Sequence, residues 1–349
     1  MRSATSSAAA TDWVASLSPW PEEFGLGRMR QLLARLGDPQ DAYPAVHVVG
    51  TNGKSTATRT IAELLRSKGL RAGAYTSPHV SGWHERLDCD PEAFERAVAR
   101  VREPAEELAA TQFEVLTAAA LVEFAEAEVD VAVMEAGLGG RLDATNVVDA
   151  QVVLLTNVAL EHTEVLGDTR EQIAQEKLAV AHAARVVVTS DNIFDDLVPP
   201  GAKIVRGGAR EAAEAFFGEP ISAPVEVTLP GRLERRGDEV WDGAHTPEAV
   251  EWLLARLPKR DYVVCASILG DKRVHELLDR LGRAGRTLVA TRSSNARALS
   301  ERELAAAGIR HFDHVQAFAD PHQALARARV LGGPVLVTGS LYLLADLYS

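Results

Sequence analysis

Residues 45–60 read AVHVVGTNGKSTATRT, and this stretch decides the fold class. The apolar run AVHVV predicts a buried strand, and the segment after the glycines predicts a helix that Gly69 ends. A glycine loop in this position turns backbone N–H groups and a helix N-terminus toward an anion, to which Lys54 adds a charge. The common phosphate-loop pattern G-x-x-x-x-G-K-[ST] would place glycine at position 48, where Val48 stands. We therefore interpret the loop as a shortened nucleotide site, the alternative being an ordinary strand-to-helix turn with an exposed lysine.

The rest of the chain alternates apolar strand patterns with helical ones. The predicted strands after this loop are AGAYT, VDVAVME, QVVLLTN and RVVVT, followed by YVVCASI, RTLVAT and PVLVTG. Helix starts are marked by Asp90 before proline, by capping patterns at Thr169 and Ser300, and by Thr246 before proline. This order predicts an α/β protein with a P-loop-containing parallel-sheet ATPase domain followed by a smaller Rossmann-like α/β domain.

The boundary between the domains is predicted from a change in composition. Residues 191–224 are rich in Pro, Gly and Ala with weak periodicity, and APVEVTLPG follows at 223–231. We place the ATP-binding domain at residues 1–226 and the second domain at 227–349. The first 17 residues contain no apolar run like that of a secretory signal, so we interpret them as a ragged terminus.

Composition excludes several classes of protein. The chain has 349 residues, 46% of them hydrophobic, and no apolar run near the ~20 residues that a membrane helix needs. Its formal net charge of −12 repels phosphates, which argues against nucleic acid or an anionic membrane as a partner. The two cysteines, Cys89 and Cys265, lie in a polar loop and an apolar strand, so we expect no disulfide and a cytoplasmic location.

Polar residues stand where predicted strands end. Glu135 ends VDVAVME, at the sheet edge where the phosphate loop also lies, and there a carboxylate can hold a nucleotide-bound metal. The glycine-rich run AGLGGRLDATN follows it, and His162 follows the next strand. Lys177 lies two turns into a helix among apolar neighbours. Taken singly, each could be an ordinary strand-end acid, a loop histidine or a surface lysine, but near Mg²⁺ a lysine could react with CO₂ to form an anionic carbamate.

The phrases that carry chemistry keep the order found in one family. They are VHVVGTNGKST, AYTSPHVSGWHERL, FEVLTAAAL, VDVAVMEAGLGGRLDATNVVD, ALEHTEVLGDTREQIAQEKLAVA, LPGRLE, DGAHTPEA, LGDKR and VLVTGSLY. Together they resemble the Mur ligase superfamily and, within it, the dihydrofolate synthase/folylpolyglutamate synthase family. The resemblance covers nearly the whole chain, and the run from Glu135 to Asn146 is its most specific part.

The resemblance implies an ATP-dependent amide ligase that adds L-glutamate to dihydropteroate and/or tetrahydrofolate through an acyl phosphate. The implied cofactors are ATP, Mg²⁺ and a carbamate on Lys177, and we expect a monomer. The implied ATP-binding residues are Gly50, Thr51, Asn52, Gly53, Lys54, Ser55, Thr56, Arg232 and Asp242. The implied metal ligands are Ser55, Thr56, Ser77, Glu135, His162 and Lys177. The implied catalytic residues are Lys54, His162, Lys177 and His245, and the implied pteroate pocket is Thr111, Gln112, Phe113, Glu114, Leu142, Asp143 and Ala144.

The chain also departs from the family pattern. Ser55 follows Lys54 directly, where the family usually has a glycine between them, which leaves open whether Ser55 or Thr56 binds the metal. Thr246 replaces the usual asparagine after His245, the stretch from Lys177 to Arg232 is shorter than usual and lacks the segment that touches adenine, and SPWPEE differs from the amino-terminal pterin loop. The alternatives are therefore a Mur-type ligase acting on another carboxylate, or a noncatalytic nucleotide-binding relative.

Overall fold

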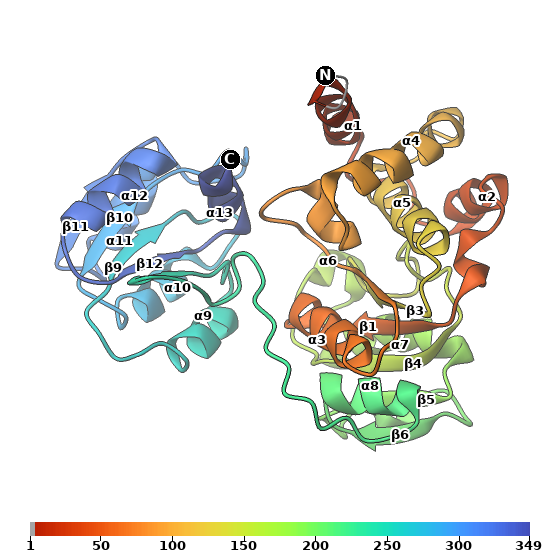
Figure 1. The fold of residues 1–349 in the computed structure, drawn as a ribbon. Helices are drawn as coiled ribbons and strands as arrows, with labels where there is room; N and C mark the ends of the chain where they lie inside the picture. The colour runs from red at the N-terminus through yellow and green to blue at the C-terminus, as the bar shows by residue number, and fades with distance from the viewer. Residues whose placement is uncertain (1–3) are drawn as a thin grey trace. The chain divides into compact units, whose positions relative to one another are not determined.

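The computed structural model of the protein describes residues 4–349 and divides the chain into two compact units. One unit comprises the chain up to His79 together with Trp83–Val227. The other comprises Val80–Gly82 and Thr228–Ser349. Each is an α/β layer structure built on a mostly parallel six-stranded sheet, which confirms the predicted fold class (Figure 1).

The sheet of the first unit is parallel throughout, with the strand order β2-β3-β1-β4-β5-β6. Its strands are β1 (Ala45–Val49), β2 (Ala72–Tyr75), β3 (Val131–Glu135), β4 (Ala150–Leu155), β5 (Val186–Thr189) and β6 (Lys203–Arg206). Strand β1 lies between β3 and β4, so the loops that leave the carboxyl ends of these three strands meet at one edge of the sheet. Open parallel sheets bind ligands at such an edge.

Helices cover both faces of this sheet, and β1, β3 and β4 are therefore buried on both sides. Helices α3 (Lys54–Arg66) and α8 (Ala209–Phe217) pack on one face (Figure 1). Helices α5 (Gln112–Glu126) and α7 (Arg170–Leu178) pack on the other face, and α1 (Ala4–Ser16), α2 (Gly27–Arg35) and α4 (Pro91–Glu107) pack against α5. Short elements connect these, namely η1 (Pro39–Ala42), η2 (Trp83–Leu87), α6 (Thr163–Leu166), η3 (Ala179–Ala183) and η4 (Asp195–Leu197).

The second unit has the strand order β11-β10-β9-β12-β8-β7, in which only the edge pair β7–β8 is antiparallel. Its strands are β7 (Glu234–Arg236), β8 (Glu239–Trp241), β9 (Val263–Ala266), β10 (Thr287–Ala290), β11 (His314–Ala317) and β12 (Val335–Thr338). Its helices are α9 (Pro247–Leu254), α10 (Val274–Leu281) and α11 (Glu301–Gly308) on one face and α12 (Pro321–Val330) and α13 (Leu341–Tyr348) on the other.

Several sequence interpretations of local structure were wrong or incomplete. The start of the chain is a helix from Ala4 rather than a ragged terminus, and Val14 in it is fully buried; residues 1–3 lie outside the described part. The weakly periodic stretch 191–224 contains β6 and α8. Helix α8 buries small alanines, Ala212 and Ala213, and β6 is a short, half-exposed edge strand, so neither produces a strong hydrophobic pattern.

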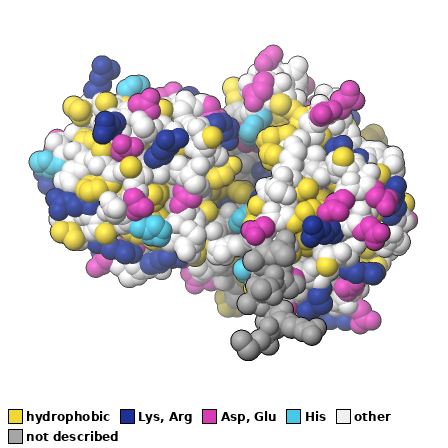
Figure 2. Space-filling model, turned by 90° about the horizontal axis from the view of Figure 1, so that it is seen from above, with side chains coloured by type: hydrophobic (Ala, Val, Ile, Leu, Met, Phe, Trp, Pro, Cys, Tyr) yellow, Lys and Arg dark blue, Asp and Glu magenta, His cyan; other side chains and the backbone are white. Residues whose placement is uncertain are grey.

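The surface agrees with the composition. On the face shown in Figure 2, lysines and arginines are interspersed with acidic side chains over the described residues and form no broad basic field. Within residues 4–349, none of the helices has both the length and the apolar character needed to cross a bilayer. Cys89 and Cys265 are both free thiols, as expected.

Candidate active site

The glycine loop follows β1 and opens α3, as the sequence predicted. Gly50 has φ of 144°, and a Cβ there would overlap the Thr156 hydroxyl and lie 3.1 Å from the Asn157 carbonyl oxygen. The loop is fixed to the segment after β4, because Asn52 N–H donates to Asn157 Oδ1 (3.0 Å) and Thr51 N–H donates to Asn157 O (3.0 Å). The loop can therefore lie against that segment only with glycine at position 50.

Lys54 lies over this loop. Its ammonium donates to the carbonyl oxygens of Gly50 (3.0 Å) and Thr51 (3.3 Å). Gly53, in left-handed conformation (φ 79°), is the N-cap of α3, so the first N–H groups of the helix have no side-chain cap. Uncapped N–H groups at the start of a helix and an adjacent ammonium are the two elements of a phosphate site.

Glu135 joins two loops at this edge of the sheet. Its side chain is 1% exposed at the end of β3, where Oε1 accepts from the Ser55 hydroxyl (3.1 Å) and Oε2 accepts from the Ser77 N–H (3.0 Å). The Ser55 hydroxyl also lies 3.5 Å from the Ser77 carbonyl oxygen. Three of the residues expected to ligate metal are thus within hydrogen-bond reach of one another, and Thr56 is exposed on the next position of α3.

The donors in this cluster are oxygens, the ligand type that Mg²⁺ prefers. In residues 4–349 no group of three or more His, Cys, Asp and Glu side chains could by itself hold a metal ion. A magnesium ion here would need hydroxyls, water and nucleotide phosphates to complete its shell, and Mg²⁺ in nucleotide sites usually keeps such ligands. Ser55 and Glu135 therefore fit Mg²⁺ delivered with ATP and do not fit a metal held by protein side chains alone.

Lys177 lies inside the first unit rather than on its surface. It is 2% exposed, and its ammonium donates to Gly50 O (3.0 Å) and to Glu161 Oε1 (2.8 Å). Burial lowers the pKa of Lys177, while Glu161 acts in the opposite direction. Burial alone would raise the pKa of Glu161, but the ammonium groups of Lys177 and Lys54 hold it below the usual value. The structure thus brings both lysines to the same glycine of the phosphate loop.

His162 has a different environment. It has a left-handed backbone (φ 46°) before α6, its side chain is 47% exposed, and Nδ1 lies 4.0 Å from Glu164. The neighbouring Glu161, not His162, is the residue of the LEH sequence that contacts Lys177. Metal ligation by His162 stays a prediction.

The glycine-rich loop after β3 packs against the helix that carries Lys177. A Cβ at Gly140 would lie 2.6 Å from the Lys177 carbonyl oxygen, and Arg141 N–H donates to Glu176 O (3.0 Å). Buried Asp143 holds the loop closed by accepting from Leu138 N–H (2.8 Å) and from Thr145 N–H (3.0 Å). The predicted pocket residues of this loop differ in exposure, since Leu142 is 46% exposed and Ala144 is buried.

The other predicted pocket segment begins α5. Thr111 and Glu114 form a reciprocal capping box, and Glu114 also accepts from Arg28 Nε at 2.8 Å. Phe113 lies 6.1 Å, centroid to centroid, from the buried Tyr75 ring, while Gln112 donates to the Val14 carbonyl oxygen (3.0 Å). Thr111 and Glu114 therefore have structural partners already, and their contact with pteroate stays a prediction.

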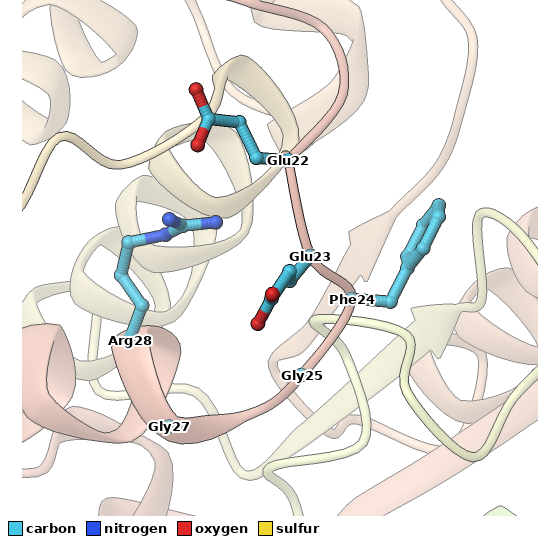
Figure 3. Close-up of a pocket in the computed structure, with 6 residues that line it drawn as sticks. All are labelled: Glu22, Glu23, Phe24, Gly25, Gly27 and Arg28. Atoms are coloured by element: carbon cyan, nitrogen blue, oxygen red, sulfur yellow. The ribbon is translucent and has the colours of Figure 1, made fainter.

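A shallow pocket lies beside Arg28. It is lined by Glu22, Glu23, Phe24, Gly25, Gly27 and Arg28. Figure 3 shows the Arg28 guanidinium between the carboxylates of Glu22 and Glu23, with the Phe24 ring turned away. These acids belong to the SPWPEE segment that departs from the family pattern, so this chain presents two acidic side chains there.

The predicted residues of the second unit lie around the start of α9. Asp242 is buried, and its two carboxylate oxygens accept from Leu233 N–H (2.7 Å) and Ala244 N–H (2.9 Å). Burial raises the pKa of Asp242, and these backbone bonds and Arg232 oppose the rise. His245 Nδ1 lies 2.8 Å from Gly243 O, and Thr246 caps α9 through Ala249 N–H. Asp242 thus fixes the loop that carries His245.

Sequence reasoning missed three residues that the structure puts in the first unit's site. Glu161 adjoins His162 in the sequence and pairs with Lys177. Asn157 is the last residue of the pattern QVVLLTN, two residues after the end of β4. Its position at the carboxyl end of a strand was a usable signal. Arg86 is a buried arginine behind the loop of Ser77, and nothing in the spacing of its sequence indicates that burial.

The Mur ligase middle domain profile matches residues 48–219, which run from β1 through α8. The matched residues include the glycine loop, Glu135 and Lys177, which meet at one edge of the parallel sheet, so the match assigns this unit to the Mur ligase class.

Relatives narrow the class to one family. The folylpolyglutamate synthase of Lacticaseibacillus casei is 30% identical over 95% of this chain and 96% of its own length. A probable bifunctional folylpolyglutamate synthase/dihydropteroate synthase of Haloferax volcanii is 32% identical over 92% of this chain, which spans only about half (48%) of that longer protein. The structure of Mycobacterium tuberculosis folylpolyglutamate synthase complexed with ADP has a TM-score of 0.87, 27% identity, and coverage of 99% of this chain and 98% of that chain. The chain belongs to the folylpolyglutamate synthase/dihydrofolate synthase family.

Proposed function

We propose that this chain uses ATP to join the amino group of L-glutamate to a carboxylate of dihydropteroate and/or tetrahydrofolate. The observation that carries the proposal is the convergence at one sheet edge. Glu135 bridges Ser55 and Ser77 there, and Lys177 reaches the carbonyl oxygen of Gly50. A carboxylate is a poor acyl donor at neutral pH, so the chemistry requires its activation by a phosphoryl group.

The reaction has two steps. A carboxylate oxygen of the acceptor attacks the γ-phosphorus of ATP, the bond to the β,γ-bridging oxygen breaks, and an acyl phosphate and ADP result. The glutamate nitrogen then attacks the acyl carbon, loses a proton and expels inorganic phosphate, which leaves an amide. Lys54 and the N–H groups of residues 50–56 would hold the phosphates in line, which is the main requirement for phosphoryl transfer.

Lys177 would act as a carbamate. Its amine, once deprotonated, adds to CO₂ and loses a second proton, which converts a cation into an anion beside the phosphate loop. A buried lysine whose pKa is lowered by desolvation is suited to this addition. Ser55 or Thr56, with Ser77, Glu135, His162 and the carbamate, would provide the protein ligands for nucleotide-bound Mg²⁺, which supplies charge neutralisation for the transferred phosphoryl group.

Three of the predicted site residues belong to the second unit. We propose that Arg232 and Asp242 contact ATP and that His245 lies near the incoming glutamate, as in the family pattern. We also propose a monomeric enzyme in the cytoplasm, where the free thiols of Cys89 and Cys265 would stay reduced.

Phosphate release by the purified protein tests the proposal. ATP, Mg²⁺ and L-glutamate are supplied with dihydropteroate, tetrahydrofolate or a cell-wall precursor as acceptor, and mass spectrometry identifies the product. We expect phosphate release and a glutamyl product with one or both pterins. Stimulation by the cell-wall precursor alone, or by no acceptor, would contradict the assignment.

A further inference from the structure

The loop that carries Ser77 is held from behind by one buried arginine. Arg86 lies in η2 and is 9% exposed. Its backbone carbonyl accepts from Thr76 N–H (2.9 Å), and its side-chain Nε donates to His79 Nδ1 (2.9 Å). The four residues from Thr76 to His79 are therefore bonded to the same arginine at both ends, with Ser77 between them.

The guanidinium is itself held by aromatic side chains. It lies 5.3 Å from the centroid of the Trp83 ring, whose centroid is 4.3 Å from that of the His79 imidazole. It also bonds to the hydroxyl of Tyr75, to which Thr117 of α5 donates at 3.1 Å. A planar guanidinium with several fixed partners has little freedom to move, which a lysine ammonium in its place would have.

Ser77 in this loop contacts Glu135, the carboxylate that we propose as a metal ligand. Ser77 N–H donates to Glu135 Oε2 at 3.0 Å, and Glu135 Oε1 accepts from Ser55 at 3.1 Å. Burial lowers the pKa of Arg86, and Tyr75 and Glu135 counteract this, so the charge of Glu135 acts on the guanidinium. A buried cation is costly unless its donors are bonded. Arrangements of the loop that break the bonds from Arg86 to His79 and Tyr75 are therefore disfavoured.

We propose that Arg86 is a positioning residue for the metal site, which from behind the Thr76–His79 loop fixes Ser77 against Glu135 so that both meet the nucleotide-bound Mg²⁺. The inference rests on the proposed function. Residues that orient metal ligands from behind typically change metal affinity about 10–100-fold when they are replaced. We expect Arg86→Met to weaken metal binding by at least about tenfold.

Manganese binding measured without turnover tests this role. Mn²⁺, in place of Mg²⁺, is titrated into protein saturated with ADP, and free Mn²⁺ is read by electron paramagnetic resonance. Arg86→Lys retains the charge but loses the fork of donors, so it should give a smaller loss of affinity in the same direction. A thermal melt of each variant in the absence of metal separates loss of stability from loss of metal affinity.

Arg210→Met is the matched control. Arg210 is a partly buried arginine of α8 in the same unit, and its guanidinium donates to the carbonyl oxygens of Ile221 and Ala223 (3.0 Å to Ala223), so its loss costs stability without removing a bond of the Thr76–His79 loop or of η2. We expect its Mn²⁺ affinity to stay within twofold of wild type.

Wild-type Mn²⁺ affinity in Arg86→Met would overturn the positioning role, as would an equal loss in Arg210→Met. If Arg86→Met does not fold, an unchanged affinity in Arg86→Lys overturns it instead. The titration needs only nucleotide and metal. A wild-type protein that binds Mn²⁺ and ADP but ligates no glutamate would therefore contradict the proposed function and leave the role of Arg86 to be judged by its own result.

Discussion

Replacing Gly50 by alanine should disable the phosphate loop by displacement rather than by loss of a functional group. Gly50 carries no side chain, yet its backbone lies against the segment after β4 and its carbonyl accepts from both Lys54 and Lys177. An added Cβ would overlap Thr156 Oγ1 and approach the Asn157 carbonyl oxygen to 3.1 Å. Thr156 is β-branched and donates to Asn52 O at 2.8 Å, so it has little freedom to turn away.

The size of the effect follows from this overlap. Unstrained contacts between a carbon and a neighbouring heavy atom lie at about 3.5 Å or more, and the added Cβ would lie well over 1 Å inside that limit from Thr156 Oγ1, so the loop must move by at least about 1 Å. A misplacement of about 1 Å in a phosphoryl-transfer site costs on the order of 10²-fold in rate. That factor corresponds to about 2.7 kcal/mol of transition-state stabilisation. The positive φ of Gly50 adds a cost in stability of about 1–3 kcal/mol for any residue with a side chain.

The assay is acceptor-stimulated phosphate release together with calorimetric ADP binding. Gly37→Ala is the control, because Gly37 also has positive φ (82°) but a Cβ there meets nothing within 4 Å. We expect the control to lose about 1 kcal/mol of stability and no activity. Thr156→Ala in the Gly50→Ala background removes the overlapping hydroxyl and should recover part of the lost rate, which a double-mutant cycle would report as coupling.

Two results would refute this reasoning. One is a Gly50→Ala protein with wild-type kcat and ADP affinity, since the loop would then tolerate the added carbon. The other is the absence of coupling with Thr156→Ala, since the loss would then come from backbone conformation alone.

Three further predictions concern buried ionisable groups. Lys177→Ala should abolish ligation, with partial rescue by acetate and none by bicarbonate; unchanged turnover would rule out the carbamate. In protein freed of CO₂, where Lys177 carries an ammonium, Glu161→Ala should lower the free energy of unfolding by about 3 kcal/mol in urea titrations, because it leaves that ammonium buried without its carboxylate, and a loss below 1 kcal/mol would show that water replaces the pair. Burial lowers the pKa of His47 to about 3, so the unfolded chain, with a pKa near 6.5, binds the extra proton. His47 should lower stability by up to about 2 kcal/mol from pH 6.5 to pH 5, and His47→Gln should lose that share, while His79, whose pKa burial also lowers to about 3, keeps its own.

The first unit's central strands and the order of the chemical motifs could be predicted because their signals are local. Glycine after an apolar run, an acid at the end of another and a proline-marked helix start are each read within about ten residues. Short elements with weak patterns were missed, among them β6, β7, β8 and α8, because their place depends on neighbours that the sequence does not identify.

The sequence also predicted which residue types the site contains but not which of them touch. It indicated His162 as a metal ligand, which stays a prediction, and it did not indicate that the carboxylate of Glu161 pairs with Lys177. It placed Lys177 two turns into a helix without deciding between surface and interior, and the structure buries it at 2% exposure.

By itself, the sequence determined the class of fold, the glycine loop between strand and helix, and the family, since these depend on residue type and spacing along the chain. Only the tertiary structure decided that Glu135 bridges Ser55 and Ser77, and that Arg86 lies buried behind them. The physical reason is that these contacts join side chains from separate strands and loops. Their distances are set by how β1, β3 and β4 align in the sheet and by which charges the packing removes from water.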